Sequence, residues 1–525
     1  MMLLSQAAEA LDARMVGADV HFDAISTDSR KIKAGDLFIA LRGENFDGYE
    51  FAAAALASGA VAAMVNVDSY AAHPAIPDPR SPILAVPDTR LALGQLAAYW
   101  RKQFDIPLVA ITGSNGKTTV KEMLAGILRA AAGNEEGVLV TRGNFNNDIG
   151  MPLTLLRMNA RHRYAVIEMG MNHPGEIDYL THLACPDVAL ITNASGAHLE
   201  GLGSVEAVAR AKGEIFAGLA HTGTAIINAD DEHAPLWRAL AGTHALLEFA
   251  LNGVTRCAPA DGMTRCAQAA GAGIPSPRLL PQTADCVSNV SEADQHADIC
   301  GQWQPHGTGL HMTVQTPHGE FTAELQVPGA HNARNVLAAT AAAIALNVPL
   351  EIIAASLQRF GGVAGRLQLK TARNGATLID DTYNANPASM RAAIGVLEQI
   401  GGKRVLVLGD MGELGGGAAA LHAEIGAEAK RAGIERLYAL GELSRNAAQA
   451  FGSGARHFER IEDLLAELEK ELDANTTVLV KGSRFMKMER VVEYLVSGEW
   501  KVESGGSGHN LPLATPHFPG GKHAA

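Results

Sequence analysis

The segment that most constrains this chain is a short glycine-containing loop, Thr-Gly-Ser-Asn-Gly-Lys-Thr-Thr, at residues 112–119. An apolar run at residues 107–111 precedes it and predicts a buried strand, and apolar residues at helical spacing follow it over residues 120–128. Strand, glycine loop, lysine, hydroxyl and helix are the parts of a phosphate-binding site, in which backbone N–H groups face the anion, the lysine reaches the terminal phosphates and the hydroxyl can hold Mg2+. The predicted nucleotide-binding residues are Gly113, Ser114, Asn115, Gly116, Lys117, Thr118 and Thr119.

This loop departs from the common phosphate-loop pattern in its length. The common pattern begins with a glycine at the position where this chain has Ile111. The shorter loop points away from generic GTPases and kinases.

Composition excludes several classes of protein. A chain of 525 residues is too long for a single core, so several domains are expected. A net charge of −13 argues against binding nucleic acid or an anionic membrane surface, because both need clustered cations. The five cysteines include no C-x-x-C pair, so neither a zinc site nor a disulfide framework is indicated and reduced thiols are expected.

The pattern of apolar residues predicts a soluble protein without membrane insertion, and the cysteine usage favours a cytoplasmic one. The N-terminus lacks the basic region and sustained apolar stretch of a signal peptide. The longest apolar runs, at residues 51–65 and 336–345, are too short to span a bilayer and are predicted to form buried helices.

The order of predicted elements indicates an α/β protein with three domains. Strand-like and helical segments alternate through the middle and last thirds of the chain, which is typical of parallel sheets covered by helices. The predicted domains are a small α/β domain at 1–84, a mostly parallel phosphate-loop domain with an antiparallel β insertion at 85–361, a Rossmann-like doubly wound domain at 362–500, and a disordered tail at 501–525.

Polar residues follow two of the strands predicted in the middle domain. Glu168 ends the run 164–168, and His198 lies in a glycine-flanked loop after the run 188–192. Ligands of open α/β sheets bind at the carboxyl ends of strands, and Mg2+ takes oxygen ligands beside substrate phosphates. Each residue alone is as well explained as a surface loop residue, but together they favour a metal site.

Four further residues have a structural and a functional interpretation. Composition alone favours a solvated helix lysine for Lys212, and Asn332 could simply cap the helix that follows it. Arg366 could form an ordinary surface ion pair. Asp381 lies between a predicted strand and helix, where carboxylates commonly accept hydrogen bonds from ribose hydroxyls.

With these residues assembled, the chain resembles the Mur ligases, the ATP-dependent amide-forming enzymes of peptidoglycan precursor synthesis. The resemblance covers about residues 20–495, and its motifs occur in the same order. The matching segments are residues 112–119, 144–152, 165–176, 197–201, 211–216, 329–335, 380–387, 409–415 and 481–484.

The resemblance implies a role for each of these residues. Lys117 and Thr118 would hold the phosphates of ATP and a first Mg2+, Glu168 would serve that ion, and His198 would serve a second. Lys212 would carry a CO2-derived carbamate, which supplies the anionic oxygen that Mg2+ prefers. The resemblance also implies that Asn332 contacts adenine, that Asp381 contacts the ribose and that Arg366 contacts a phosphate. Ser29 and Arg30 would lie near the UDP part of the acceptor.

Within the family, two phrases favour the member that adds D-alanyl-D-alanine to UDP-MurNAc-tripeptide. They are Tyr-Asn-Ala-Asn-Pro at 383–387 and Asp-Met-Gly-Glu-Leu-Gly at 410–415. The implied partners are these two small substrates, and the implied state is a monomer. Two alternatives are another amide ligase of the same build, including one that adds glutamate to folate, and a phosphate-loop switch that hydrolyses nucleotide without an amine acceptor.

The sequence leaves open whether the third residue of the acceptor peptide is diaminopimelate or lysine. It also leaves open the general base, which could be a carboxylate or His198. The segment 256–277 and the tail have no counterpart in the family pattern.

Overall fold

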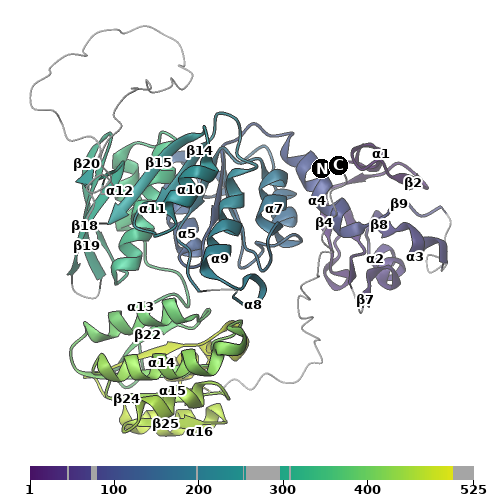
Figure 1. Cartoon of the computed structure of the whole chain (residues 1–525). Helices are drawn as coiled ribbons and strands as arrows, with labels where there is room; N and C mark the ends of the chain where they lie inside the picture. The colour runs from purple at the N-terminus through teal and green to yellow at the C-terminus, as the bar shows by residue number, and fades with distance from the viewer. Residues whose placement is uncertain are drawn as a thin grey trace, which may run out of the picture.

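The computed structural model describes residues 1–43, 46–72, 80–196, 199–251, 254–255, 296–306 and 309–499. Its three largest sheets belong to three α/β domains, which follow one another along the chain (Figure 1). The predicted three-domain α/β architecture is confirmed. The segment 256–277 and the proposed tail lie outside the described residues.

The N-terminal domain is built on a five-stranded sheet with the order β2-β9-β8-β5-β4, in which only the β2–β9 pair is antiparallel. Two short antiparallel pairs, β1–β3 and β6–β7, flank it. The elements are β1 (Met2–Leu3), α1 (Leu4–Ala10), β2 (Arg14–Val16), β3 (His21–Phe22), β4 (Ala24–Ser26), η1 (Ser29–Lys31), β5 (Asp36–Ile39), β6 (Arg42–Gly43), β7 (Phe46–Asp47), η2 (Gly48–Phe51), α2 (Ala52–Ala57), β8 (Ala62–Asn66), α3 (Val67–Ala72) and β9 (Ile83–Val86).

The prediction of one buried helix over residues 51–65 is wrong. Helix α2 ends at Ala57, and the chain passes through Gly59, whose φ of +115° suits glycine, before β8 begins at Ala62. Both elements are rich in small apolar residues, so the apolar run alone did not reveal the turn between them.

The central domain contains a nine-stranded sheet with the order β11-β12-β10-β13-β14-β15-β18-β19-β20. Pairing is parallel from β11 to β18 and antiparallel from β18 to β20. The elements are α4 (Thr89–Arg101), β10 (Leu108–Thr112), α5 (Lys117–Ala132), η3 (Glu135–Gly137), β11 (Val138–Val140), α6 (Gly150–Leu155), β12 (Tyr164–Glu168), α7 (Glu176–Ala184), β13 (Val188–Ile191), α8 (Leu199–Leu202), α9 (Val205–Gly213), η4 (Glu214–Phe216), β14 (Thr224–Asn228), α10 (Ala234–Ala241), β15 (Ala245–Leu251), β16 (Val254–Thr255), β17 (His296–Ala297), β18 (Ile299–His306), β19 (Gly309–Thr316), β20 (Gly319–Leu325), α11 (Ala330–Ala345) and α12 (Leu350–Gln358).

The inner parallel strands β10, β12, β13 and β14 are buried on both faces, which explains why they are largely apolar. In β10, Val109 and Ile111 pack into the core beneath α5 and α11, whereas Leu108 and Ala110 pack into the opposite core. Parallel strands covered by helices on both sides show this pattern. The predicted antiparallel insertion is the β19–β20 hairpin, and the apolar run 336–345 lies in α11 as predicted.

The C-terminal domain has a six-stranded sheet with the order β21-β22-β26-β23-β24-β25, parallel except for the β21–β22 pair. Figure 1 shows it as a separate layered unit next to the central domain. The elements are β21 (Gln368–Thr371), β22 (Thr377–Asp381), α13 (Pro387–Glu398), β23 (Lys403–Gly409), η5 (Gly415–Gly417), α14 (Ala418–Arg431), β24 (Arg436–Leu440), α15 (Ser444–Phe451), β25 (Ala455–Phe458), α16 (Ile461–Leu468), η6 (Glu469–Glu471), β26 (Thr476–Lys481), η7 (Arg484–Met486) and α17 (Glu489–Ser497).

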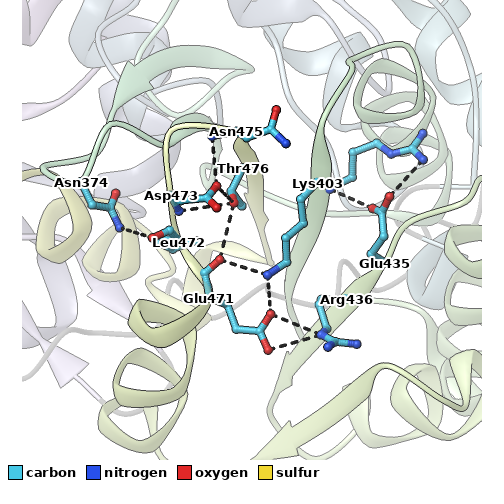
Figure 2. A network of polar contacts seen from close by, with 10 residues as sticks. Asn374, Lys403, Glu435, Arg436, Glu471, Leu472, Asp473, Asn475 and Thr476 are labelled. Carbon is cyan, nitrogen blue, oxygen red and sulfur yellow. Dashed lines mark hydrogen bonds and ion pairs between the residues drawn. The ribbon is translucent and has the colours of Figure 1, made fainter.

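Ion pairs and hydrogen bonds cover the amino ends of the C-terminal strands (Figure 2). Lys403, at the start of β23, pairs with Glu471, which also lies 3.4 Å from Arg436 at the start of β24. The Thr476 hydroxyl, at the start of β26, donates to Asp473 across 2.7 Å. These charges satisfy one another, so the polar groups available for ligands are those at the opposite, carboxyl ends of the strands.

Candidate active site

A cavity of about 2080 Å³ lies where the three domains meet. Central strands bring residues to it from their carboxyl ends, including Glu168, the last residue of β12, and Asn228, the last residue of β14. The C-terminal domain contributes Asp381 and Lys481 from the carboxyl ends of β22 and β26. This is where open α/β sheets bind their ligands.

The phosphate loop runs from the end of β10 to the start of α5, as the sequence predicts. Gly113 has a φ of +148° and Gly116 a φ of +85°. A Cβ atom on Gly113 would lie 1.9 Å from the Thr192 hydroxyl oxygen, and one on Gly116 would lie 2.4 Å from the Asn335 side-chain oxygen. Both positions therefore require glycine, because the loop packs directly against β13 and α11.

Hydrogen bonds to the segment after β13 hold this loop in place. The Ser114 N–H donates to the Asn193 carbonyl across 2.9 Å, and the Asn115 N–H donates to the Asn193 side-chain oxygen across 3.0 Å. The Ser195 N–H donates to the Ser114 hydroxyl across 2.9 Å. These contacts with the segment after β13 fix the shape of the loop.

Lys117 folds back over the loop that it follows. Its Nζ donates to the Gly113 carbonyl across 2.6 Å. Burial lowers the pKa of this lysine, while the nearby Glu168 carboxylate opposes that change and Arg366 adds to it. The ammonium is therefore held at the mouth of the loop, within the cavity.

Thr118 and Glu168 meet directly, as the proposed metal site requires. The Thr118 hydroxyl donates to Glu168 Oε2 across 2.9 Å, and Glu168 is only 3% exposed. Within the described ranges, no group of three or more His, Cys, Asp or Glu residues is arranged to hold a metal ion by itself. An ion bound here would need oxygen ligands from a nucleotide as well.

Lys212 is buried, so the interpretation as a solvated helix lysine is wrong. It lies on α9 with 1% exposure. Burial, with a further contribution from Lys117, lowers the pKa of Lys212 well below its ordinary value. Among the residues that the structure describes, no carboxylate pairs with it.

His198, the other proposed metal ligand, lies outside the described residues.

Two predicted C-terminal residues reach the cavity. Arg366 Nη2 donates to the Thr118 hydroxyl across 2.8 Å, and its guanidinium lies 4.2 Å from the centre of the Tyr383 ring. Asp381 accepts from Lys481 Nζ across 2.6 Å and from the Leu367 N–H across 3.2 Å. Arg366 is therefore a contact between domains and not an isolated surface ion pair.

Asn332 lines the cavity from the first turn of α11. The helix has Gly329 at its N-cap position and no side-chain cap, so capping does not account for Asn332. Its Nδ2 donates to the Pro328 carbonyl across 2.8 Å, and its Oδ1 accepts from Asn335 across 3.1 Å. The next turn of the same helix thus orients this amide.

The structure does not bring Ser29 and Arg30 to the cavity. Arg30 donates twice to Asp28, across 2.8 and 3.0 Å, and its side chain is 77% exposed. The N-terminal domain instead contributes Arg42 and Asn66 to the lining.

Sequence reasoning missed several cavity residues. Lys481 pairs with Asp381, the Asn386 amide donates to the Asn115 side-chain oxygen across 3.0 Å, and Asn146 donates to Glu168 across 2.8 Å. His331 lies beside them, and burial lowers its pKa to about 4, so its ring is neutral near pH 7. The amides of residues 144–147 were a visible signal, but their targets depend on tertiary contacts.

No helix in the described part of the chain is both long and apolar enough to cross a membrane.

Sequence comparison identifies relatives over nearly the whole chain. Models of the Mur ligase family match residues 21–101 (catalytic domain), 111–258 (middle domain) and 365–484 (glutamate ligase domain). UDP-N-acetylmuramoyl-tripeptide–D-alanyl-D-alanine ligase of Escherichia coli K12 is 41% identical over 94% of this chain and 98% of its own length. The ligase of the same name from Bacillus subtilis is 34% identical over 90% of this chain and 93% of its own length.

Solved structures agree with these relatives. MurF from Acinetobacter baumannii is 33% identical and superposes with a TM-score of 0.78 over 94% of this chain and 98% of its own. MurF from Thermotoga maritima, solved with ADP, is 24% identical with a TM-score of 0.70 over 90% and 96%, which shows the shared fold. Escherichia coli FolC, at 17% identity and a TM-score of 0.56 over 77% and 92%, likewise shows the fold alone.

Proposed function

This chain belongs to the Mur ligase family, and on that premise we propose that it joins D-alanyl-D-alanine to UDP-N-acetylmuramoyl-tripeptide while ATP is cleaved to ADP and phosphate. It is an ATP-dependent ligase of peptidoglycan precursor synthesis. One observation carries the mechanism: the phosphate loop and the polar ends of two sheets face a single cavity of about 2080 Å³.

The first step activates the acceptor. An oxygen of the terminal carboxylate of the tripeptide attacks the γ-phosphorus of ATP, the bond from that phosphorus to the bridging oxygen breaks, and ADP leaves. The product is an acyl phosphate. Activation is needed because a carboxylate resists nucleophiles and its oxygen is a poor leaving group.

The second step forms the amide. The free amine of D-alanyl-D-alanine attacks the acyl carbon, a tetrahedral intermediate forms, and phosphate leaves with the bonding electron pair while the amine loses a proton. Closure of the C-terminal domain onto the central domain when nucleotide binds would keep water from the acyl phosphate.

Two cations of this chain reduce repulsion in the first step, in which two anions must meet. Lys117 would move its ammonium from the Gly113 carbonyl to the terminal phosphates, and Arg366 would pair with the same phosphates from the C-terminal domain. Both already lie at the loop, so little rearrangement is needed at the moment of reaction.

The oxygen donors at the loop fit a magnesium ion. The Thr118 hydroxyl and the Glu168 carboxylate are of the type that Mg2+ prefers, and both face the cavity. His198 would serve a second ion. When bound with ATP, Mg2+ neutralises phosphate charge and orients the γ-phosphoryl group.

Lys212 fits the carbamate proposal. Its lowered pKa favours the neutral amine, whose lone pair can attack CO2 to form an N–C bond with release of one proton. The anionic carbamate would extend this side chain, which does not itself line the cavity, and would provide a further oxygen ligand near Lys117. A buried amine without an anionic partner in the described structure supports this proposal.

The remaining assignments follow the family pattern. Asn332 would contact adenine, and Asp381, held by Lys481, would accept from ribose. Ser29 and Arg30 do not line the cavity, so they would contact the UDP part only where the acceptor extends beyond it. The cavity is lined by residues from all three domains of one chain, which supports a monomer as the working unit. The use of ATP and a UDP-linked substrate supports a cytoplasmic location.

The two alternatives predict different substrate requirements. A folate ligase would turn over a pteroate substrate with glutamate, and a nucleotide switch would release phosphate without an amine acceptor. The test measures phosphate release by the purified chain with ATP, UDP-MurNAc-tripeptide and D-alanyl-D-alanine, omitting one at a time. We expect release only with all three; equal release without D-alanyl-D-alanine or without the tripeptide would overturn the proposal.

A further inference from the structure

The two oxygens of the Glu168 carboxylate are held from different sides. Oε2 accepts from the Thr118 hydroxyl across 2.9 Å and lies 3.8 Å from the buried Lys121 ammonium. Oε1 accepts from Asn146 Nδ2 across 2.8 Å. A carboxylate held through one oxygen only can turn about its terminal bond, whose torsional preference is weak. The Asn146 contact is what fixes the plane of the group.

Asn146 is itself locked to the end of the strand that carries Glu168. Its carbonyl accepts from the Gly170 N–H across 2.8 Å. A Cβ atom on Gly170 would lie 2.9 Å from the Asn146 side chain, so glycine at this position leaves room for the amide. The main chain and the side chain of Asn146 therefore each form a hydrogen bond with the segment at the end of β12.

The three partners of Glu168 differ in what a bound cation would do to them. Thr118 is itself a proposed ligand, so its hydroxyl cannot also serve as an independent support. Lys121 is 1% exposed and donates to the Thr141 carbonyl across 2.8 Å, so its ammonium supplies counter-charge while its hydrogen bond goes elsewhere. Asn146 is neutral and lines the cavity, and among the described residues its side-chain amide donates only to the carboxylate.

We propose that Asn146 is a positioning residue, which orients the Glu168 carboxylate for the cation that accompanies the nucleotide. This inference rests on the proposed function. Hydrogen-bond partners of metal ligands commonly contribute about 10- to 100-fold to metal affinity. The loss of Asn146 should therefore weaken the effect of Mg2+ on nucleotide binding, while binding of the nucleotide without metal persists.

The experiment measures ADP affinity by calorimetry for the wild-type chain and for Asn146→Leu, with Mg2+ and with EDTA. Leucine has nearly the same size as asparagine and cannot donate. We divide the dissociation constant of ADP in EDTA by the constant in Mg2+. In Asn146→Leu we expect this ratio to fall about 10-fold or more, with the affinity in EDTA changed less than about 3-fold. Asn146→Ala provides the same comparison if the leucine variant melts early, and Asn134→Ala, an exposed amide of the same domain, is the matched control.

Two results would overturn the inference. The first is an unchanged ratio: it shows no orienting role if both affinities are intact, and a structural role only if both fall equally. The second is a wild-type chain whose ADP affinity does not depend on Mg2+. The proposed function fails separately, through phosphate release that does not depend on D-alanyl-D-alanine.

Discussion

Arg366 of the C-terminal domain donates a hydrogen bond to the hydroxyl of Thr118 in the phosphate loop, 248 positions earlier in the chain. The guanidinium is also placed over the Tyr383 ring at 4.2 Å, a distance at which a cation is attracted by the aromatic face. The C-terminal domain thereby presents a cation to the place where the terminal phosphates of ATP would lie.

Replacement of Arg366 by alanine should reduce kcat/KM for ATP about 100-fold, because a preorganised donor to developing negative charge is lost. Steady-state kinetics with saturating acceptor and amine would measure it. Arg359→Ala, an exposed arginine of the central domain, should leave kcat/KM unchanged. If kcat/KM for ATP were the same in Arg366→Ala and in the wild-type chain, the phosphate contact would be excluded.

The sequence predicted the local parts of this site well, because each part is formed by residues that follow one another in the chain. The strand–loop–helix order around Lys117 and the position of Glu168 at a strand end follow from apolar periodicity and from glycines that the backbone requires. The contact of Arg366 with Thr118 and of Asn146 with Glu168 depends on which strand ends become neighbours. No local pattern contains that information.

The error at residues 51–65 has a related cause. Alanine-rich segments suit a helix and also a tightly packed strand, so composition did not distinguish α2 from β8. Lys212 shows the opposite case: its helix was predicted, but only the packing of α9 against its neighbours buries the side chain.

Lys212→Ala should lose most of the ligase activity, and short carboxylates such as acetate or formate should restore part of it by supplying an anionic oxygen. Lys102→Ala, an exposed lysine of the same domain, should neither lose activity nor respond to carboxylates. A carbamate signal in the 13C NMR spectrum of the wild-type chain under labelled CO2 gives a second measurement. Normal turnover by Lys212→Ala would refute the carbamate.

Gly113→Ala should abolish tight nucleotide binding, because the added Cβ would lie 1.9 Å from the Thr192 hydroxyl oxygen at a φ that alanine disfavours. Calorimetry with ADP would detect the loss. Gly126→Ala is the matched control: a Cβ there meets no atom within 4 Å, and the site lies inside α5. That variant should bind ADP normally and be more stable by about 0.5–1 kcal/mol.

Glu471 should make stability depend on acid pH. The hydrogen bond from Lys403 lowers the pKa of this carboxyl below its ordinary 4.5, so its contribution is present above that value and is lost as pH falls through the lower, folded-state pKa (Figure 2). Glu471→Gln should lower the melting temperature at pH 7. The free energy of unfolding should fall by about 1 kcal/mol or less. The difference from wild type should shrink below pH 4.5.

Glu493→Gln, an exposed carboxylate of the same domain, serves as the control and should show no such pH dependence. A gap between Glu471→Gln and wild type that stays constant from neutral to acid pH would exclude the ion pair as its origin.

The transfer of oxygen from the acceptor to phosphate tests the central claim most directly. UDP-MurNAc-tripeptide labelled with 18O in its terminal carboxylate is turned over with ATP and D-alanyl-D-alanine, and the released phosphate is analysed by mass spectrometry. The acyl-phosphate route predicts one 18O atom per phosphate, carried over when the amine displaces it. Phosphate that contains oxygen from solvent water and none from the carboxylate would contradict the account.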